Sequence, residues 1–199
     1  MKIYTVPAGV LRSNAYLLTE NDKDAVLIDC GGLEPLRFAE EKGLTIREVL
    51  LTHGHFDHIG GCRAAQLAGA RIGCSETASG LIFTSENLGR TMGVQIPSFS
   101  IDFTFRDGET LDRYGMRFVV IATPGHTPGG VCFRCGGDLF TGDTLFLESV
   151  GRTDFPGGDA SLLRESVRKL LVLPEDLTVH PGHGGPTTIG HERKYNPYV

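Results

Sequence analysis

The sequence contains no uninterrupted apolar run long enough to cross a bilayer, for which a helix needs about 20 residues. Its first residues, MKIYTVPAGVLRSNAYLL, have no long apolar core behind a basic head and no small-residue cleavage site. We therefore expect a cytoplasmic protein that associates with no membrane.

A disulfide framework is missing as well. The cysteines are odd in number and have no framework spacing: Cys30, Cys62, Cys74, Cys132 and Cys135. Cys132 and Cys135 form a C-x-x-C pair, but on an extended strand their Cα atoms would lie about 10 Å apart, beyond the ~7 Å that a disulfide allows. No second cysteine pair is present to complete a zinc site. We expect five reduced thiols.

An excess of positive charge is also absent. With 19 Lys and Arg against 24 Asp and Glu, the formal net charge is −5, so the general footprint of a nucleic-acid-binding protein is lacking. An anionic substrate would need a local basic pocket. The 199 residues, 40% hydrophobic and 22% charged, are typical of a globular protein with one sizeable core. No linker or low-complexity tract divides them, so we expect one domain over residues 1–199.

Short strands and glycine-rich loops alternate with a few modest helices. We expect strands at Lys2–Val6, Ala15–Thr19, Ala25–Asp29, Val49–Thr52, Arg71–Cys74, Arg117–Ala122, Val131–Arg134, Asp138–Thr141 and Thr178–His180. Helices are expected at Pro35–Lys42, Gly60–Ala68 and Ala160–Leu171. The segments NAYLLTENDKDAVLID and GVCFRCGGDLFTGD read as hairpins. Hairpins mixed with crossover helices predict an α/β fold of two mixed sheets with helices outside.

The densest group of potential metal ligands lies in the segment THGHFDHIGG, residues 52–61. His53, His55, Asp57 and His58 follow the apolar run REVLLT, which reads as a buried strand. Imidazole and carboxylate groups are the usual ligands of an ion such as zinc. One tetrahedral ion does not need four ligands from one segment, so the pattern indicates two adjacent ions. Surface histidines with Asp57 as a helix cap are the simpler alternative, but they do not account for the whole pattern.

Three downstream segments repeat this arrangement. ATPGHTPGG presents His126 on a loop, LFTGDTLF places Asp143 at a strand end, and TVHPGHGGPTT presents His183 after another short strand. All three follow the carboxyl ends of expected strands, where open α/β sheets place their ligands. His180 competes with His183 for the same role. We prefer His183, because its Pro-Gly-His-Gly setting frees it from the strand.

THGHFDH, followed in order by His126, Asp143 and His183, resembles the metallo-β-lactamase fold superfamily over essentially the full length. The segments HFDHIGG, PGHTPGG, GDTLF, GRTDFPGGD and PGHGGPTTIG are most similar to the small single-domain relatives of glyoxalase II, the hydroxyacylglutathione hydrolases. The resemblance implies an αββα sandwich with a two-metal site at one edge.

The resemblance also implies how the ligands are shared. The first ion would be held by His53, His55 and His126, and the second by Asp57, His58 and His183. Asp143 would bridge both. Zinc is the first expectation for both positions, with iron or manganese as alternatives.

Two such ions, roughly 3.5–4 Å apart, can lower the pKa of a bridging water from 15.7 to about 7. The resulting hydroxide would attack an acyl carbonyl, so no Ser or Cys nucleophile is needed, and Asp57 would accept its hydrogen bond as the catalytic carboxylate. A thioester suits this site because a thiolate leaves more easily than an amine. We expect a small-molecule thioester substrate, with S-lactoylglutathione as the first candidate.

The substrate-binding residues are less constrained by the sequence. Larger glyoxalase II enzymes carry a C-terminal helical extension whose basic residues grip glutathione, whereas this sequence ends at NPYV soon after His183. The grip would be missing or built differently, so we expect poor saturation by an anionic tripeptide. Arg152 and Lys194 are the first candidates for substrate contact, although Arg152 also reads as a loop brace for Asp154.

Two other functions remain open. An iron-dependent persulfide dioxygenase resembles this group closely and shares the RTDF element, and there His53, His126 and Asp143 would hold one Fe(II). The HFDH segment, with Phe56, is more similar to the hydrolases than to the HADH of the dioxygenases. A non-catalytic metal-binding module of the same fold is the second alternative, which the complete ligand set disfavours.

Overall fold

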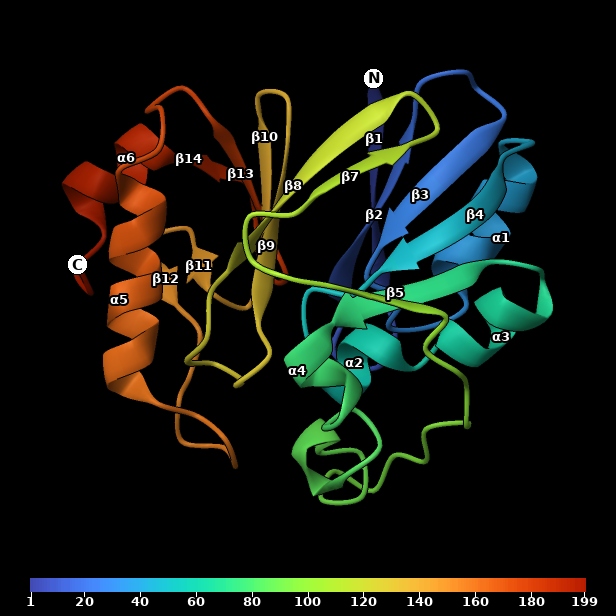
Figure 1. Ribbon diagram of the computed structural model, residues 1–199, viewed down its shortest axis with the longest axis horizontal. Helices are drawn as coiled ribbons and strands as arrows, with labels where there is room; N and C mark the ends of the chain where they lie inside the picture. The colour runs from blue at the N-terminus through green and yellow to red at the C-terminus, as the bar shows by residue number, and fades with distance from the viewer.

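The computed structural model describes residues 1–199, and it consists of two packed β-sheets with helices on both outer sides (Figure 1). The first sheet has the order β1-β2-β3-β4-β5-β6 and the second the order β14-β13-β10-β9-β8-β7. Both sheets are mixed: β3, β4, β5 and β6 run parallel, as do β10 and β13, and the remaining neighbours are antiparallel. A small hairpin, β11-β12, stands apart.

The strands of the first sheet are β1 (Lys2–Ala8), β2 (Ser13–Thr19), β3 (Asp24–Ile28), β4 (Thr45–Leu50), β5 (Arg71–Ser75) and β6 (Phe103–Phe105). Those of the second are β7 (Thr110–Arg113), β8 (Met116–Ala122), β9 (Val131–Cys135), β10 (Asp138–Gly142), β13 (Thr178–Pro181) and β14 (Thr187–Thr188). The hairpin comprises β11 (Leu145–Phe146) and β12 (Ser149–Val150). The helices are α1 (Glu34–Glu41), α2 (Phe56–Ile59), α3 (Cys62–Leu67), α4 (Glu76–Ser79), α5 (Ala160–Leu171) and α6 (Ile189–Tyr195), with a 3₁₀ turn at Ser85–Asn87.

Alternation along the strands gives each sheet two apolar faces. On β2, Ala15 and Leu17 belong to the core under α1 and α3, whereas Tyr16 and Leu18 belong to the core between the two sheets. A third core joins the outer face of the second sheet to α5, through Leu163 and others. Three apolar interfaces therefore hold four layers together, which confirms the expected αββα sandwich.

All nine expected strands are present, with shifted ends, and both expected hairpins form as β2-β3 and β9-β10. Helix α5 has the expected bounds, because the Asp159 side chain caps its first turn by accepting from the N–H groups of Ser161 (2.7 Å) and Leu162 (3.0 Å). The sequence analysis did not predict the short strands β6, β7, β11, β12 and β14, nor the helices α4 and α6.

The first residue predicted for the helix at Gly60–Ala68 is wrong. The chain forms the short helix α2 first and begins α3 only at Cys62. The break lies at Gly61, whose N–H donates to the Cys30 carbonyl (2.7 Å) and whose Cα lies so close to the Gly32 carbonyl that a side chain would collide with it. This contact ties the ligand-bearing segment to the end of β3.

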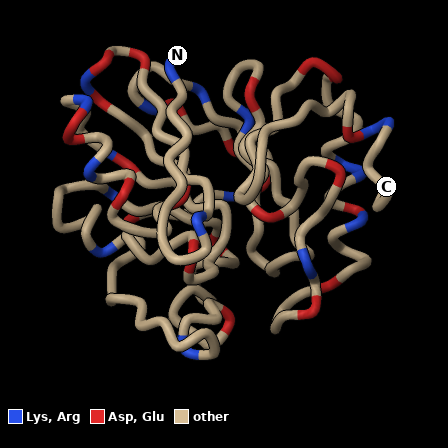
Figure 2. The backbone as a smooth tube through the Cα atoms, turned by 180° about the vertical axis from the view of Figure 1, so that it is seen from behind, with Lys and Arg blue, Asp and Glu red and all other residues tan.

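All five cysteines are free and buried, as expected from their spacing. Lys and Arg residues are interspersed with Asp and Glu along the backbone (Figure 2). None of the helices combines the length and the apolar character needed to cross a bilayer.

Candidate metal centre

The loop that follows β4 carries the first potential ligands. β4 ends at Leu50, and the chain then runs through His53 and His55 into α2, which presents Asp57 and His58. The Leu51 N–H donates to the Gly73 carbonyl (2.9 Å), so this loop is still anchored to β5 where it leaves the sheet. All four potential ligands are at least 95% buried.

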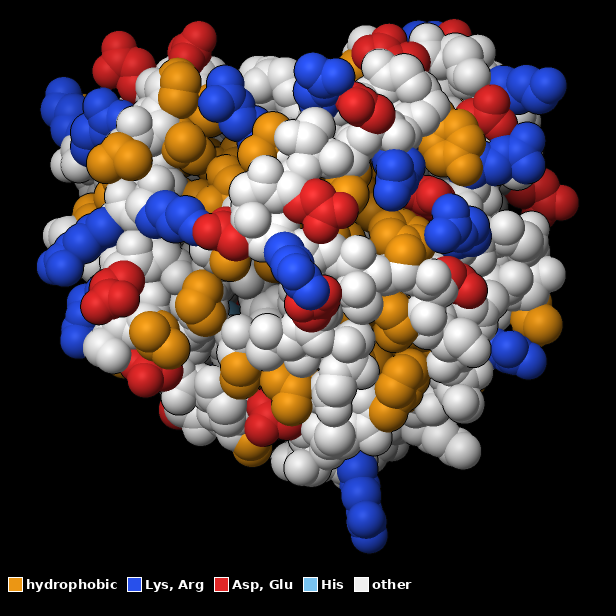
Figure 3. Space-filling model, viewed as in Figure 1, with side chains coloured by type: hydrophobic (Ala, Val, Ile, Leu, Met, Phe, Trp, Pro, Cys, Tyr) orange, Lys and Arg blue, Asp and Glu red, His pale blue; other side chains and the backbone are white.

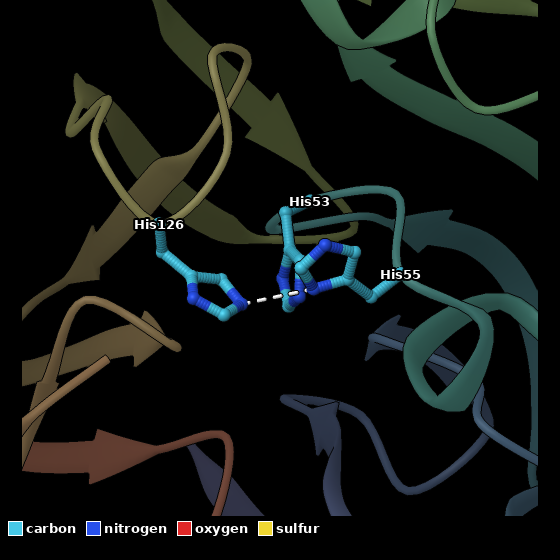
Figure 4. Close-up of side chains that lie close together, drawn as sticks. All are labelled: His53, His55 and His126. Atoms are coloured by element: carbon cyan, nitrogen blue, oxygen red, sulfur yellow. Dashed lines mark hydrogen bonds between the residues drawn. The ribbon is translucent and has the colours of Figure 1, made fainter. Parts of the chain in front are cut away.

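His126, on the loop after β8, joins His53 and His55 to form the first potential metal-binding group (Figure 4). One potential ligand atom from each of the three lies within 4.8 Å of the others. The His126 Nε2 lies 2.9 Å from the His55 Nδ1, so these two rings point at a common position. The His126 Nδ1–H donates to the Arg152 carbonyl (2.7 Å), which directs the ring and leaves Nε2 as its ligand atom.

A second group consists of Asp57, His58 and His183, again within 4.8 Å of one another. The His183 Nε2 lies 3.1 Å from the Asp57 Oδ2, and the His58 Nε2 lies 3.5 Å from the same oxygen. His183 lies on the loop after β13, so this group joins the two sheets.

Asp143, directly after β10, lies between the two groups. Its Oδ2 is 3.5 Å from the His126 Nε2 and 3.7 Å from the His183 Nε2, and its Oδ1 is 3.4 Å from the His58 Nε2. The carboxylate therefore reaches members of both groups, which is the placement that a bridging ligand requires. The structure brings together all seven side chains that the sequence analysis named as ligands.

Several buried polar atoms in this cluster have no hydrogen-bond partner. They include the Nε2 atoms of His53 and His58 and the Oδ1 atom of Asp143. Buried polar atoms are rarely left unpaired, because the loss of hydration is costly. Imidazole nitrogens and carboxylate oxygens that converge without partners fit a site for divalent metal ions.

The pKa values of His53, His55 and Asp143 suit metal binding, whereas His58 has to give up a proton, because Asp57, Asp143 and Asp29 outweigh its burial and raise its pKa well above the ordinary value. Burial lowers the pKa of His55 to about 3, and burial also holds the pKa of His53 well below its ordinary value, with neighbouring histidines adding to both shifts. Burial would raise the pKa of Asp143, but the hydrogen bond and charge of His58, together with the charges of His53 and His126, outweigh it and hold this pKa well below its ordinary value. Neutral histidines and an ionised carboxylate are the forms that coordinate a metal.

Asp29, which was not predicted from the sequence, supports this cluster from the side of β3. Its Oδ2 accepts from the His58 Nδ1–H (2.8 Å) and from the Thr52 hydroxyl (2.7 Å), and its Oδ1 accepts from the Thr52 N–H (2.8 Å). Because the Thr52 hydroxyl donates to Asp29, its oxygen accepts from the His53 Nδ1–H (3.0 Å). Both histidines therefore present Nε2 to the cluster.

Two other histidines lie outside the cluster. The His180 Nε2 is bonded to the Asp138 Oδ1 (2.8 Å), and its ring stacks on Phe140. The His191 Nε2 lies 2.9 Å from the Glu148 Oε1.

The two candidate substrate residues differ in position. Arg152 lies at the mouth of the cavity above the cluster, where its guanidinium makes two hydrogen bonds to Asp154 (2.7 and 2.6 Å) and stacks on Phe155. Lys194 lies on α6, with its Nζ over the ring of Tyr195. It is not part of the wall of that cavity.

The cavity above the cluster has a volume of about 480 Å³. Its walls include five of the seven potential ligands, His55, Asp57, His126, Asp143 and His183. Around them stand mostly apolar side chains: Leu11, Phe56, Leu88, Met92, Phe146, Val150 and Phe155. The cluster is therefore reached from solvent through an apolar mouth.

Residues 8–183 match the family model described as the metallo-beta-lactamase superfamily. The chain belongs to this superfamily. Among curated proteins, it is 38% identical to the hydroxyacylglutathione hydrolase GloC of Haemophilus influenzae, an alignment that covers the whole chain and 98% of GloC. It is also 32% identical to the probable metallo-hydrolase YqgX of Bacillus subtilis, over the whole chain and 98% of YqgX.

Solved structures of the superfamily share the same fold. The BLEG-1 B3 metallo-beta-lactamase superposes with a TM-score of 0.92 at 35% identity, covering 99% of each chain. A di-iron-bound form of TTHA1623 gives 0.88 at 35% identity, covering 98% of this chain and all of the other. ETHE1 from Myxococcus xanthus gives 0.80 at 29% identity, covering 99% of this chain and 84% of the other. The chain is thus a metallo-hydrolase of this superfamily with a His and Asp cluster suited to metal ions.

Proposed function

We propose that this protein is a binuclear metal-dependent hydrolase of small acyl thioesters, with S-lactoylglutathione as the first candidate substrate. The observation that carries the proposal is the convergence of seven potential ligands, five of which line one solvent-reachable cavity. The likeness to GloC, which is named a hydroxyacylglutathione hydrolase, supports the choice of substrate class.

His53, His55 and His126 would hold one ion, Asp57, His58 and His183 the other, and Asp143 would serve both. Zinc is the first choice for this nitrogen-rich set, and the di-iron form of TTHA1623 supports iron as the second. When bound, such ions polarise an acyl carbonyl and lower the pKa of water from 15.7 to about 7.

The protein itself determines which ring nitrogen of these histidines carries the proton. The Nδ1–H of His53 donates to the Thr52 hydroxyl. That of His58 donates to Asp29, and that of His126 donates to the Arg152 carbonyl. The ligand nitrogens are therefore oriented before any ion binds, which removes the cost of ordering them later. Asp57, whose Oδ2 lies 3.1 Å from the His183 Nε2, would accept a hydrogen bond from the attacking water and orient it.

No competing side-chain nucleophile is present. All five cysteines are buried, and no serine or cysteine is hydrogen-bonded to a histidine anywhere in the chain. Nucleophilic catalysis by Ser or Cys needs such an adjacent base. The free thiols also support the cytoplasmic location expected from the sequence.

The apolar mouth of the cavity favours a small acyl group. Leu88 and Phe155 line it from opposite loops, and Met92, half-exposed, extends it outward. A lactoyl group would displace water from these side chains as it approaches the cluster, which contributes roughly 25 cal/mol per Å² of apolar surface covered.

Steady-state assays on protein loaded separately with Zn²⁺ and Fe²⁺ test the proposal. We expect hydrolysis of S-lactoylglutathione, followed as release of the free thiol, with loss of the activity in His126→Ala. Oxygen uptake with glutathione persulfide by the iron form, without thioester cleavage under either metal, would contradict it and favour the persulfide dioxygenase. His191→Ala, which alters a histidine outside the cluster, is the matched control and should retain the activity.

Hydrolysis of β-lactams is a second candidate, because BLEG-1, with a TM-score of 0.92, is described as a B3 metallo-beta-lactamase. The same preparations should be tested with a chromogenic cephalosporin. Its cleavage with a higher kcat/KM than that of every thioester would make the β-lactam the better substrate class.

A further inference from the structure

A second cavity lies beside the metal cavity and is the larger of the two, with a volume of about 670 Å³. The two share three wall residues, Ser149, Val150 and Arg152. The two cavities therefore adjoin at β12, and the second extends along the groove between α5 and the segment 197–199. A volume of this size fits a small ligand, for which about 300–1,000 Å³ is usual.

Helix α5 is fixed against the ligand-bearing loop. The Asp159 N–H donates to the Gly125 carbonyl (2.8 Å), and the Ser166 hydroxyl donates to the Pro124 carbonyl (2.7 Å). Pro124 and Gly125 directly precede His126. The groove along α5 therefore begins next to the candidate metal ligands, and two hydrogen bonds hold its wall in place.

Two arginines of α5, Arg164 and Arg168, line this groove. Their spacing of four residues puts them on one side of the helix, with side chains about 6 Å apart at their Cβ atoms. Neither forms an ion pair within the chain, whereas the neighbouring Lys169 is bound to Asp107 and Arg152 to Asp154. Figure 3 shows basic side chains over the part of the surface where α5 and α6 lie.

Two guanidinium groups without an ion pair thus line one cavity, and no Asp or Glu side chain lines it. The wall between them is apolar, formed by Leu163 and Val167, and Tyr198 faces it from the segment 197–199. This combination of two guanidinium groups with an apolar floor suits an extended ligand that carries carboxylates, which guanidinium binds with two parallel hydrogen bonds.

We propose that Arg164 and Arg168 bind the carboxylates of the thiol half of the substrate, while its acyl half lies at the metal cluster. This inference rests on the proposed thioester function and specifies its substrate class: the thiol is a carboxylate-bearing peptide of about the size of glutathione. Helix α5, which is part of the sandwich, then binds the thiol half of the substrate in place of a C-terminal helical extension.

The test compares S-lactoylglutathione with an uncharged thioester, S-lactoyl-N-acetylcysteamine, in the variants Arg164→Gln and Arg168→Gln. Each variant should raise KM for S-lactoylglutathione about fivefold, the effect of losing one exposed ion pair, and leave kcat nearly unchanged. KM for the uncharged thioester should not change. Arg63→Gln, which removes an exposed arginine on α3 away from both cavities, is the matched control and should alter neither value.

Binding of glutathione itself, measured by calorimetry on the metal-loaded protein, separates this inference from the proposed function. Binding weakened about fivefold by Arg164→Gln would support the arginine site even if no thioester is turned over. Unchanged KM and binding in both variants, or no binding by the wild-type protein, would overturn it while leaving thioester hydrolysis intact. If the two variants raised KM only for a coenzyme A thioester, the arginines would bind phosphate. That result would contradict the assignment to carboxylates.

Discussion

Each histidine of the cluster has two ring nitrogens, and the structure gives them different tasks. In His53, His58 and His126 the Nδ1–H is held by a protein oxygen, so Nε2 remains for a metal. Two of these three contacts depend on Asp29, directly or through Thr52. Asp29 has a φ of +59°, a left-handed conformation that is uncommon for a residue other than glycine, and this backbone turn directs its carboxylate toward the cluster.

We predict that Asp29→Asn lowers the affinity for metal about 10- to 100-fold, the usual effect of altering a group that orients a ligand. The amide cannot accept from all three of its present donors, so the orientation of His58 is lost first. Metal dissociation constants from competition with a chromophoric chelator measure the effect. Asp24→Asn, which alters a partly buried partner of Arg47 at the start of β3, is the control. Equal affinities in the two variants would contradict the role of Asp29.

The two histidines of TVHPGHGG give a second prediction. His183→Ala should remove about one metal ion per chain, because the side chain lies within 4.8 Å of the ligand atoms of Asp57 and His58. His180→Ala should leave the metal content intact, since its Nε2 is bonded to Asp138. Elemental analysis of both purified variants decides between them. Loss of metal from the His180 variant alone would mean that the ligand is misassigned.

At this scale, the sequence predicted all seven side chains that the structure brings together, because each lies in a short segment that follows a strand. Asp29 also follows an apolar strand, in the segment AVLIDCGG, and this is the signal that singled out Asp143. Its role was missed because it depends on the parallel pairing of β3 with β4, which brings Asp29 beside Thr52 across 23 residues of sequence. The groove arginines Arg164 and Arg168 were missed because an exposed helix face is normally charged.

Among the elements, α2 and α3 are separated by a contact with residues distant in sequence, although the local sequence pattern favours one helix. The sequence favours one helix from Gly60, but the chain breaks at Gly61 because the backbone at Cys30 and Gly32 approaches too closely for a side chain. The short strands β6, β7, β11, β12 and β14 have at most four residues each, too few to show an alternation. β6, β7 and β14 are defined by pairing with a longer strand at the edge of a sheet, and β11 and β12 by pairing with each other.

We predict that Gly61→Ala destabilises the protein by about 1–3 kcal/mol, the usual cost of forcing a side chain into a filled space. The added methyl group would meet the Gly32 carbonyl and the Cys30 sulfur. Gly137→Ala is the control, because no atom lies within 4 Å of the added carbon and its φ is not left-handed. Urea denaturation curves of both variants test this. A Gly61 variant as stable as the Gly137 variant would show that the close approach is not required.

For the molecule as a whole, three apolar cores in series hold the four layers, and the metal cluster lies where loops from both sheets meet. From this continuity we infer a single domain over residues 1–199. The sequence predicted the layers because helices and hairpins alternate. It did not predict how the loops would meet to form the two adjoining cavities, since that depends on how the sheets pack.

The buried thiols give a prediction at this scale. Burial raises the pKa of Cys74 to about 12 and the pKa values of Cys132 and Cys135 to about 11. At pH 8 about one such thiol in a thousand or fewer is a thiolate, the form that reacts with disulfide reagents. The native protein should therefore show no rapid reaction with Ellman's reagent, and all five thiols should react in guanidinium chloride. A fast-reacting thiol in the native protein would contradict this burial.

The most direct test of the binuclear hydrolase is to titrate the metal-free protein with Zn²⁺ while following hydrolysis of S-lactoylglutathione. The seven converging ligands predict that the rate rises until two ions are bound per chain and then stays constant. A rate that reaches its maximum at one ion per chain would contradict the binuclear site. No hydrolysis at any loading, with two ions bound, would leave the metal site standing and refute the thioester as its substrate.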